Sequence, residues 1–467
     1  MVKAFRPPKK THHKKGKTSH QALRLEIDSL DHEGLGVAKQ HSPIVFVSGA
    51  LPGETCLVDI TEQKKQVFKG RVKQVLQASR HRKEAICPHF NQCGGCQTQY
   101  VDHQTMLGFK QEAITQLLNK LGAVDIEQDV PWQSPILDSD VAYRRKARLA
   151  VDFRQEQSPR IGYRGKGTAE VINITSCPVL KPDLAALIAP IRTLCFELNN
   201  KRAIGHIELL QGDRQEGSEY VDTRPLVVFR MTKDLSQQDK QIISSFAQQQ
   251  GCDVALELQN SRFEMLAGMS ANIDYSLTNS ISLKAQVTDF IQVNPVVNRK
   301  VVATAIEWLD IKTSDIVLDL YCGLGNFSLP VAEIAKQVVG LEGVPEMVQR
   351  ASQNAQQNGI SHVDFFCRDL DQPEALKKWL GLGVNKVILD PSRVGAKALM
   401  SQIAELKPEK ILYVSCNPAT FGRDIATLMQ LKASNKRYVG YQLRKIALLD
   451  MFPYTAHTEV IALLERG

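Results

Sequence analysis

Residues 411–418, ILYVSCNP, are an apolar run that ends in a cysteine. The run has the composition of a buried strand, and Asn417 and Pro418 cannot continue it, so Cys416 is expected at the edge of a sheet. A second apolar strand, EVIALLER, begins at Glu459. A thiolate is a strong nucleophile, and a carboxylate can act as a general base. The two residue types together indicate covalent catalysis, with Cys416 as the nucleophile and Glu459 as the base.

The elements that would carry both residues lie in a region of alternating strands and helices, residues 276–467. This alternation is typical of βαβ units and predicts an α/β fold with a doubly wound, Rossmann-like sheet. Ligands of such a sheet bind at the carboxyl ends of the strands. The segments predicted to be strands are DIVLDLYC, QVVGLEG, VDFFCRD, KVILDPS, ILYVSCN, YQLRKIALL and EVIALLER.

The first of these strands leads into a turn that suits a nucleotide-like cofactor. In DLYCGLGNFSLPVA, residues 319–332, Gly323 and Gly325 allow a ligand to approach the backbone closely. The third glycine of the dinucleotide fingerprint is absent. Glu342 ends the next strand, where a carboxylate can accept hydrogen bonds from two ribose hydroxyls. Asp369 ends the third strand, where it can hold an adenine amino group.

This layout is similar to the cofactor site of methyltransferases that use S-adenosylmethionine. The similarity implies that Tyr321 and Asn326 line the site and that Gln292, in DFIQVNP, approaches it from just before the fold. Asp390, in DPSRVG, ends the fourth strand, close enough to hydrogen-bond a substrate. Each residue alone also allows a structural role, such as helix capping by Asn326.

A thiol beside a reactive methyl group solves a specific chemical problem. C5 of a pyrimidine is a poor nucleophile, and a thiolate that adds at C6 creates an enolate with electron density at C5. C5 then attacks the methyl group, a base removes the remaining C5 proton, and the thiolate leaves. The sequence therefore predicts methylation of a pyrimidine at C5 through an adduct on Cys416, resolved by Glu459.

Four of the ten cysteines form a candidate metal site. In CPHFNQCGGCQ, Cys87, Cys93 and Cys96 have the spacing C-x5-C-x2-C, and Cys177 in TSCPVL is the best candidate for a fourth ligand. Four thiolates suit Zn²⁺ or an iron–sulfur cluster, but zinc sites more often use paired C-x2-C units. The spacing therefore favours a [4Fe–4S] cluster. Reduced buried cysteines without a metal are the structural alternative.

The first eighty residues predict an RNA-binding region. Residues 1–20 are a basic arm without acidic residues, which holds nearly all of the net charge of +8 and suits a polyanion. Residues 21–80 contain short alternating runs between Gly and Pro turns, which predict a small β-barrel of about five strands. Their order, with DHEGLGVA at 31–38, resembles the OB-like TRAM domain of RNA-modifying enzymes. A solubilising tail and a protein-docking barrel are the alternatives.

Residues 81–275 are predicted to form a central α+β domain that carries the cysteines. It opens with a helix, MLGFKQEAITQLLNKL, and continues as a strand-rich region. Residues 141–154, VAYRRKARLAVDFR, could lay a basic, aromatic face along a phosphate backbone. A solvated edge strand protected by its charges is the alternative. Residues 200–275 suggest no chemistry.

The SCNP, DPSR and MFPYTAHTE motifs, the four cysteines and the barrel make the chain similar to the RlmD (RumA) type family of 23S ribosomal RNA uracil-C5 methyltransferases. The similarity extends over nearly the whole length and implies methylation of uracil 1939 with Cys416 as nucleophile and Glu459 as base. It also implies that the four cysteines hold a [4Fe–4S] cluster. Tyr454 is a departure, because the family commonly has histidine there. The residues implied for the cofactor and catalytic pocket are Gln292, Tyr321, Asn326, Glu342, Asp369 and Asp390.

Other functions fit parts of the sequence. Cytosine methyltransferases usually carry a second cysteine after a proline at the fourth strand, where this chain has Asp390, Pro391 and Ser392. A noncatalytic RNA-binding protein with the same fold would leave Cys416 and Glu459 without a purpose. Related enzymes that act on transfer RNA or on another ribosomal uridine mostly lack either the cluster or the barrel.

Length and composition limit the remaining possibilities. A chain of 467 residues is too long for one core and is expected to hold two or three domains. It contains neither an apolar run of roughly 20 residues that could cross a bilayer nor a secretory signal. We therefore expect a cytoplasmic monomer that binds 23S ribosomal RNA and needs neither a membrane nor an obligate protein partner.

Overall fold

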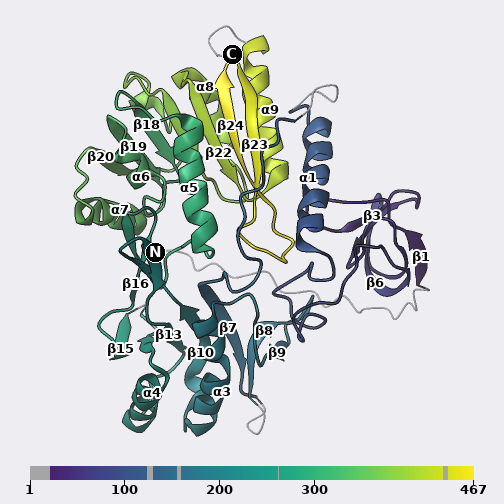
Figure 1. Ribbon diagram of the computed structural model, residues 1–467, viewed down its shortest axis with the longest axis vertical. Helices are drawn as coiled ribbons and strands as arrows, with labels where there is room; N and C mark the ends of the chain where they lie inside the picture. Colours follow the sequence, from purple (N-terminus) through teal and green to yellow (C-terminus); the bar gives the residue numbers. More distant parts are fainter. Residues whose placement is uncertain (1–21, 124–129, 155–158, 261, 435–439) are drawn as a thin grey trace, which may run out of the picture. The chain divides into compact units, whose positions relative to one another are not determined.

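The computed structural model describes residues 22–123, 130–154, 159–260, 262–434 and 440–467 (Figure 1). The basic arm expected at residues 1–20 lies outside the described residues. The chain divides into two compact units. The smaller unit contains Leu35–Arg80 and the described residues up to Leu30, and the larger contains Asp31–Gly34 and His81–Gly467.

The smaller unit is a six-stranded sheet with the strand order β1-β5-β6-β4-β3-β2. Its strands are β1 (Leu23–Glu26), β2 (Ser29–Leu30), β3 (Gly36–Ala38), β4 (Ile44–Ser48), β5 (Thr55–Gln63) and β6 (Val67–Gln77). There is one strand more than the sequence suggested, because the two-residue β2 is too short to produce an alternating pattern. A Cβ on Gly70 would lie 2.4 Å from Val58, so only glycine lets β6 approach the core of this unit.

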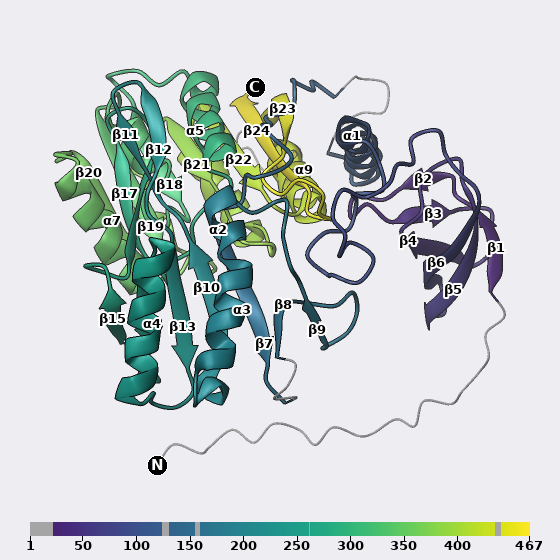
Figure 2. The same ribbon diagram turned by 60° about the horizontal axis from the view of Figure 1, so that its bottom comes forward.

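The larger unit begins with helix α1 (His103–Lys120) and a seven-stranded central sheet, ordered β15-β14-β13-β10-β7-β8-β9. Figure 2 shows helices α3 and α4 lying along this sheet, and they bury one of its faces. Two hairpins, β11–β12 and β16–β17, complete the region. The bounds are β7 (Lys146–Asp152), β8 (Arg160–Arg164), β9 (Val171–Asn173), α2 (Pro182–Ala186), α3 (Ile188–Glu197), η1 (Lys201–Ala203), β10 (Ile204–Leu210), β11 (Asp213–Glu216), β12 (Glu219–Asp222), β13 (Leu226–Met231), α4 (Gln237–Gln250), β14 (Asp253–Glu257), β15 (Phe263–Ala267), β16 (Asn272–Ser276) and β17 (Ser282–Gln286).

The C-terminal region is the predicted doubly wound sheet, ordered β20-β19-β18-β21-β22-β24-β23. The first five strands are parallel, and β24 is antiparallel to both of its neighbours. All seven predicted strand segments form strands. The bounds are α5 (Pro295–Leu309), β18 (Ile316–Leu320), α6 (Ser328–Ala332), β19 (Gln337–Glu342), α7 (Pro345–Gln357), β20 (Val363–Cys367), η2 (Lys377–Trp379), β21 (Lys386–Leu389), η3 (Lys397–Leu399), α8 (Met400–Leu406), β22 (Lys410–Ser415), α9 (Pro418–Ser434), β23 (Tyr441–Leu449) and β24 (Glu459–Arg466).

Both faces of this sheet are covered. Helices α5, α6 and α7 pack on one face, and α8 and α9 pack on the other. Helix α1, from far earlier in the sequence, joins the second face through Leu107, Ile114 and Leu118. A Cβ on Gly422 of α9 would lie 2.7 Å from Leu121, so glycine permits the close approach of α1 to α9. As a result, α1 lies against the sheet that carries the predicted catalytic residues.

The basic segment at 141–154 is not the edge strand that the sequence offered as an alternative, and its role as a phosphate-binding face stays a prediction. Strand β7 lies between β10 and β8, inside the central sheet. Arg145 is fully buried, and its guanidinium pairs with Asp213 at 3.3 Å and lies over the ring of Tyr275. Tyr143 is buried as well. The alternating pattern predicted a strand correctly, but Arg145 and Tyr143 face the interior, whereas the Arg148 side chain is 67% exposed.

The buried ion pair gives a prediction about stability. The Asp213 carboxylate accepts hydrogen bonds from Arg145, Arg299 and the amide of Ser276. Asp213→Asn keeps an acceptor for the amide but leaves the Arg145 charge uncompensated in the interior. We expect the free energy of unfolding to fall by roughly 3 to 5 kcal/mol, measured by urea unfolding. The control is Asp152→Asn, because the partner of Asp152, Arg154, is 85% exposed and such a pair contributes about 0 to 1 kcal/mol. Equal losses in the two variants would contradict the prediction.

Candidate active site

Strand register brings the proposed nucleophile and base together. Strands β22 and β24 are antiparallel, and Ser415 pairs with Val460. The same register continued by one residue sets Cys416 opposite Glu459. Strand β21 runs parallel to β22 on its other side, so Asp390 emerges at the same edge of the sheet. The fold therefore gathers three residues from distant parts of the sequence at one place.

Burial and the neighbouring negative charges oppose ionisation of Cys416, Glu459 and Asp390. Burial raises the pKa of Cys416, and the negative charges of Glu459 and Asp390 raise it further. Burial and Asp390 raise the pKa of Glu459 to about 8, while Lys110 and Arg393 act in the opposite direction. Burial raises the pKa of Asp390 to about 7. Near neutral pH, a substantial fraction of each group is therefore in its neutral form.

The turn after β18 has the backbone that a close ligand requires. Tyr321, Gly323 and Gly325 all have positive φ values, of 64°, 57° and 95°. The Glu342 carboxylate accepts hydrogen bonds from the amides of Gly323 at 3.3 Å and Val344 at 3.0 Å. The turn and the carboxylate thus form one unit at the ends of β18 and β19.

The other predicted cofactor residues have defined neighbours. Asn326 does not cap a helix, because its side-chain amide exchanges two hydrogen bonds with Asn298 of α5, at 2.9 and 3.2 Å. The backbone carbonyl of Gln292 accepts a hydrogen bond from the Nε of Arg145. Asp369 accepts a hydrogen bond from Gln372 at 2.7 Å and lines a groove of about 730 Å³. Burial raises the pKa of Tyr321, and the negative charge of Asp369 raises it further, so Asp369 lies near the turn after β18.

Two buried polar atoms near the turn suit a bound ligand. The Tyr321 hydroxyl and one carboxylate oxygen of Asp319 have no hydrogen-bond partner within the described part of the chain. The other Asp319 oxygen accepts a hydrogen bond from the Ser328 hydroxyl at 2.5 Å. Buried polar groups are normally paired, so unpaired ones beside a glycine turn fit a polar cofactor.

The four predicted metal-ligand cysteines share one cavity. Cys87, Cys93, Cys96 and Cys177 line a space of about 260 Å³. A Cβ on Gly94 would lie 2.8 Å from the Arg164 carbonyl, so glycine is needed where this loop meets β8. Burial raises the pKa of the Cys96 thiol to about 12. Among the described residues, no three His, Cys, Asp or Glu side chains are arranged to hold a single metal ion.

Four functional candidates were not predicted from the sequence. Lys110 and His103 of α1 contact the segment 450–458, which leads into Glu459, and Asp450 and Arg393 add charge to the site. Arg393 follows DPS and could have been found in that motif. No sequence signal links α1 to Glu459, because the two are separated by more than three hundred residues.

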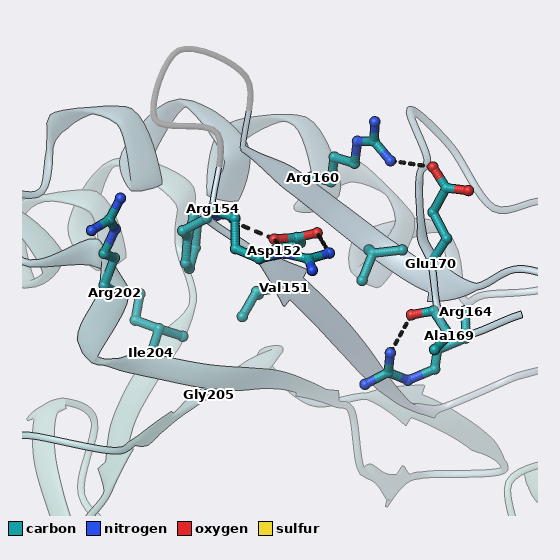
Figure 3. A pocket seen from close by; sticks show the side chains of 12 residues that line it. Val151, Asp152, Arg154, Arg160, Arg164, Ala169, Glu170, Arg202, Ile204 and Gly205 are labelled. Atoms are coloured by element: carbon teal, nitrogen blue, oxygen red, sulfur yellow. Dashed lines mark hydrogen bonds and ion pairs between the residues drawn. The ribbon is translucent and has the colours of Figure 1, made fainter. Parts of the chain in front are cut away.

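A broad groove on the central sheet holds none of the predicted site residues. It has a volume of about 960 Å³ and lies over the ends of β7 and β8 (Figure 3). Four arginines and two acids line it, and the acids are paired, Asp152 with Arg154 and Glu170 with Arg160. The groove is a mixed-charge surface of the central sheet and is separate from the predicted catalytic residues.

The fold and site define a class of protein, the S-adenosylmethionine-dependent RNA uracil-C5 methyltransferases. The family model described as tRNA (Uracil-5-)-methyltransferase matches residues 274–467, and the TRAM domain model matches residues 17–73. The chain belongs to the family of 23S rRNA (uracil(1939)-C(5))-methyltransferases RlmD, as its curated relatives demonstrate. It is 39% identical to the Shewanella woodyi protein of that name over 95% of this chain and 96% of the relative. It is 38% identical to the Vibrio cholerae protein over the full length of both.

A solved structure has the same fold. The Pyrococcus abyssi tRNA (uracil-54, C5)-methyltransferase, in complex with S-adenosyl-L-homocysteine, superimposes with a TM-score of 0.69. It is 22% identical and covers 95% of this chain and 100% of its own. The TRAM domain expected from the barrel pattern is confirmed by the domain model. Of the helices that the structure describes, none is both long and apolar enough to cross a membrane.

The electrostatic coupling at this site predicts the reactivity of the thiol. Glu459→Gln removes a negative charge that raises the pKa of Cys416, so more thiolate should form at about pH 9, where the Glu459 carboxylate is mainly ionised. We expect Cys416 to be alkylated by iodoacetamide several-fold faster in this variant, as measured by peptide mass spectrometry. The exposed Cys367 of the same molecule is the internal reference. Glu465→Gln, on the same strand, is the matched control, and equal rates in the two variants would refute the coupling.

Proposed function

We propose that this chain methylates C5 of one uridine of 23S ribosomal RNA, uracil 1939, with S-adenosylmethionine as the methyl donor. The observation that carries the proposal is the placement of Cys416 opposite Glu459, at the sheet edge where Asp390 also emerges. The curated relatives named for this reaction match the chain over nearly its full length. This sheet edge carries a thiol that can add to C6, a carboxylate that can remove the C5 proton, and a further acid that can bind the substrate.

The reaction begins when the Cys416 thiolate adds to C6 of the uracil ring and forms a carbon–sulfur bond. The electron pair of the C5–C6 double bond moves into the enolate, and C5 becomes nucleophilic. S-adenosylmethionine, when bound, would supply the methyl group: C5 takes the methyl as the methyl–sulfur bond breaks, and the electron pair of that bond stays on the cofactor sulfur, which leaves as a neutral thioether. Glu459 then takes the C5 proton, the C5–C6 double bond re-forms, and the thiolate leaves. The reaction therefore needs no oxidant or reductant.

The remaining residues of the site have roles that follow from their positions. Glu342 lies where a carboxylate can bind the ribose hydroxyls of the cofactor, and Asp369 where it can bind adenine. Tyr321, with its unpaired hydroxyl, and Asn326 border the cofactor at the turn after β18. Gln292 and Asn326 are assigned to the cofactor side of the site. Asp390 is assigned to the substrate or cofactor side of the catalytic centre.

We also infer that Cys87, Cys93, Cys96 and Cys177 hold a [4Fe–4S] cluster. The four cysteines line one cavity, and only Cys93 and Cys96 have the C-x2-C spacing that zinc sites use in pairs, which favours an iron–sulfur cluster over zinc. The reaction above transfers no electrons, so the cluster has a structural role. Gln97 follows Cys96. Its backbone amide donates a hydrogen bond to the Tyr454 carbonyl, and its side-chain oxygen accepts one from the Ala456 amide, shortly before Glu459. A cluster here would therefore stabilise the approach to the base.

The RNA-binding surface is assigned to the N-terminal module. TRAM domains occur in RNA-modifying enzymes, and the barrel carries basic residues along β6. The basic arm would add phosphate contacts. The substrate is ribosomal RNA, so the protein is expected to act in the cytoplasm, as a monomer on its RNA.

Two substitutions should separate the catalytic steps. Cys416→Ala removes the nucleophile, so neither a covalent adduct nor methylated uridine should form, although RNA still binds. Glu459→Gln keeps the shape but removes the base, so a methylated RNA joined to Cys416 should accumulate. The adduct is detected by denaturing electrophoresis and mapped by mass spectrometry. Appreciable methylation by the Cys416→Ala protein, or an adduct on another cysteine, would overturn the proposal.

Replacing a proposed cluster ligand should destabilise the fold of the cysteine loop. In Cys93→Ser, iron and acid-labile sulfide should be lost, and solubility and RNA affinity should fall. Iron analysis and RNA filter binding measure these effects in the same preparation. Cys367→Ser, which alters an exposed cysteine, is the control and should keep its iron. Full activity and RNA affinity in a folded, iron-free protein would count against a structural cluster.

A further inference from the structure

The segment that leads into the base is held by a buried lysine from a distant helix. We name residues 450–458 the base loop, because Glu459 follows it directly. Lys110 of α1 is 4% exposed, and its ammonium group donates hydrogen bonds to the carbonyl oxygens of Thr455, at 3.1 Å, and His457, at 2.7 Å. A buried ammonium group requires several partners, and two of the three donors are used here.

The same helix makes a second contact with the base loop. His103 lies seven residues before Lys110, so both side chains are on the same face of α1. The His103 Nε2 atom lies 2.5 Å from a carboxylate oxygen of Asp450, at the start of the base loop. The helix thus contacts the loop at both ends, and Lys110 is the contact nearer to Glu459.

We propose that Lys110 is a positioning residue for Glu459. Lys110 anchors the base loop and places a buried positive charge beside the Glu459 carboxyl group. The inference depends on the proposed function, because it assigns Lys110 to the step in which Glu459 removes the C5 proton. Lys110 contacts backbone carbonyl groups of the base loop, and it influences proton removal only through its effect on Glu459. The positive charge favours the carboxylate form of the base, which is the form that accepts a proton.

The surrounding charges support this assignment. Lys110 lowers the pKa of Glu459, against the effects of burial and of two neighbouring acids. Burial also lowers the pKa of Lys110 to about 8, while Asp450 and Glu459 act to keep it charged. The described titratable and charged groups that face Glu459 are Asp390, Arg393, Cys416, Asp450 and Lys110, and those that face Lys110 are Asp450, Glu459 and His457.

Two variants separate anchoring from charge. Lys110→Gln keeps amide donors for the two carbonyls but removes the charge, and Lys110→Met removes both. The full-length proteins are given an RNA fragment in which the target uridine carries tritium at C5, with S-adenosylmethionine labelled on its methyl group. Single-turnover methyl transfer reports the step before the base acts, and tritium release reports the base step. Both are followed from about pH 6 to about pH 10.

In both variants, the midpoint of tritium release should move to higher pH, because Glu459 loses the charge that favours its ionised form. A shift of one pH unit makes release about tenfold slower below both midpoints. Methyl transfer should change much less, so covalent methylated RNA should accumulate. Lys110→Arg keeps the charge and should retain the wild-type midpoint even if its rate is lower. Leu118→Ala, which removes a buried side chain from the same helix, is the packing control and should not move the midpoint.

An unchanged midpoint in Lys110→Gln would overturn the inference and leave the proposed function intact, since methyl transfer would still be observed. Absence of both methyl transfer and tritium release in the wild-type protein would instead refute the proposed function. If Lys110→Met does not fold, Lys110→Gln and Lys110→Arg still decide the role of the charge. An equal alkaline shift in Leu118→Ala would assign the effect to helix packing and also overturn the inference.

Discussion

The antiparallel insertion of β24 beside β22 is the constraint on which the proposed catalytic centre depends. In the parallel part of the sheet, only carboxyl ends reach the ligand-binding edge. Because β24 runs in the opposite direction, its first residue, Glu459, arrives at that edge beside Cys416. A register shift of one residue would turn Glu459 to the other face of the sheet, and a shift of two would move it by roughly 7 Å. The pairing of these two strands therefore fixes the positions of the proposed nucleophile and the proposed base together.

The register of β24 alone does not determine how the chain enters the strand. The base loop is held by residues from the N-terminal side of the larger unit. Tyr143 donates a hydrogen bond to the Pro453 carbonyl, and the amides of Gln97 and Thr98 donate to the Tyr454 carbonyl. Tyr454 itself has a positive φ of 64°, a conformation that bulky residues rarely adopt without such support. The cysteine loop and α1 therefore support the segment that leads into the proposed base, although neither belongs to the doubly wound sheet.

The sequence predicted the parts of the fold whose signals are local. Seven apolar runs identified the seven strands of the C-terminal sheet, since buried parallel strands are continuous apolar segments. The segment 141–154 shows where local signals fail. Its alternation predicted β7, but the direction of Arg145 depends on Asp213, a partner supplied by a distant hairpin. Lys110 was missed for the same reason, because nothing near it in sequence reveals that it meets the base loop.

The charges of the site explain why so many acidic groups can be buried together. Cys416, Asp390 and Glu459 all have raised pKa values, each with burial as the largest cause. A group held neutral avoids most of the desolvation cost of a buried charge. A raised thiol pKa also lowers the thiolate fraction, which protects a half-exposed cysteine from oxidation between turnovers. Lys110 and Arg393 lower the pKa of Glu459 against this effect, and in the proposed mechanism Glu459 must be ionised to accept the C5 proton. Burial, which favours the neutral groups, is thus opposed by two cations that favour the ionised form of the proposed base.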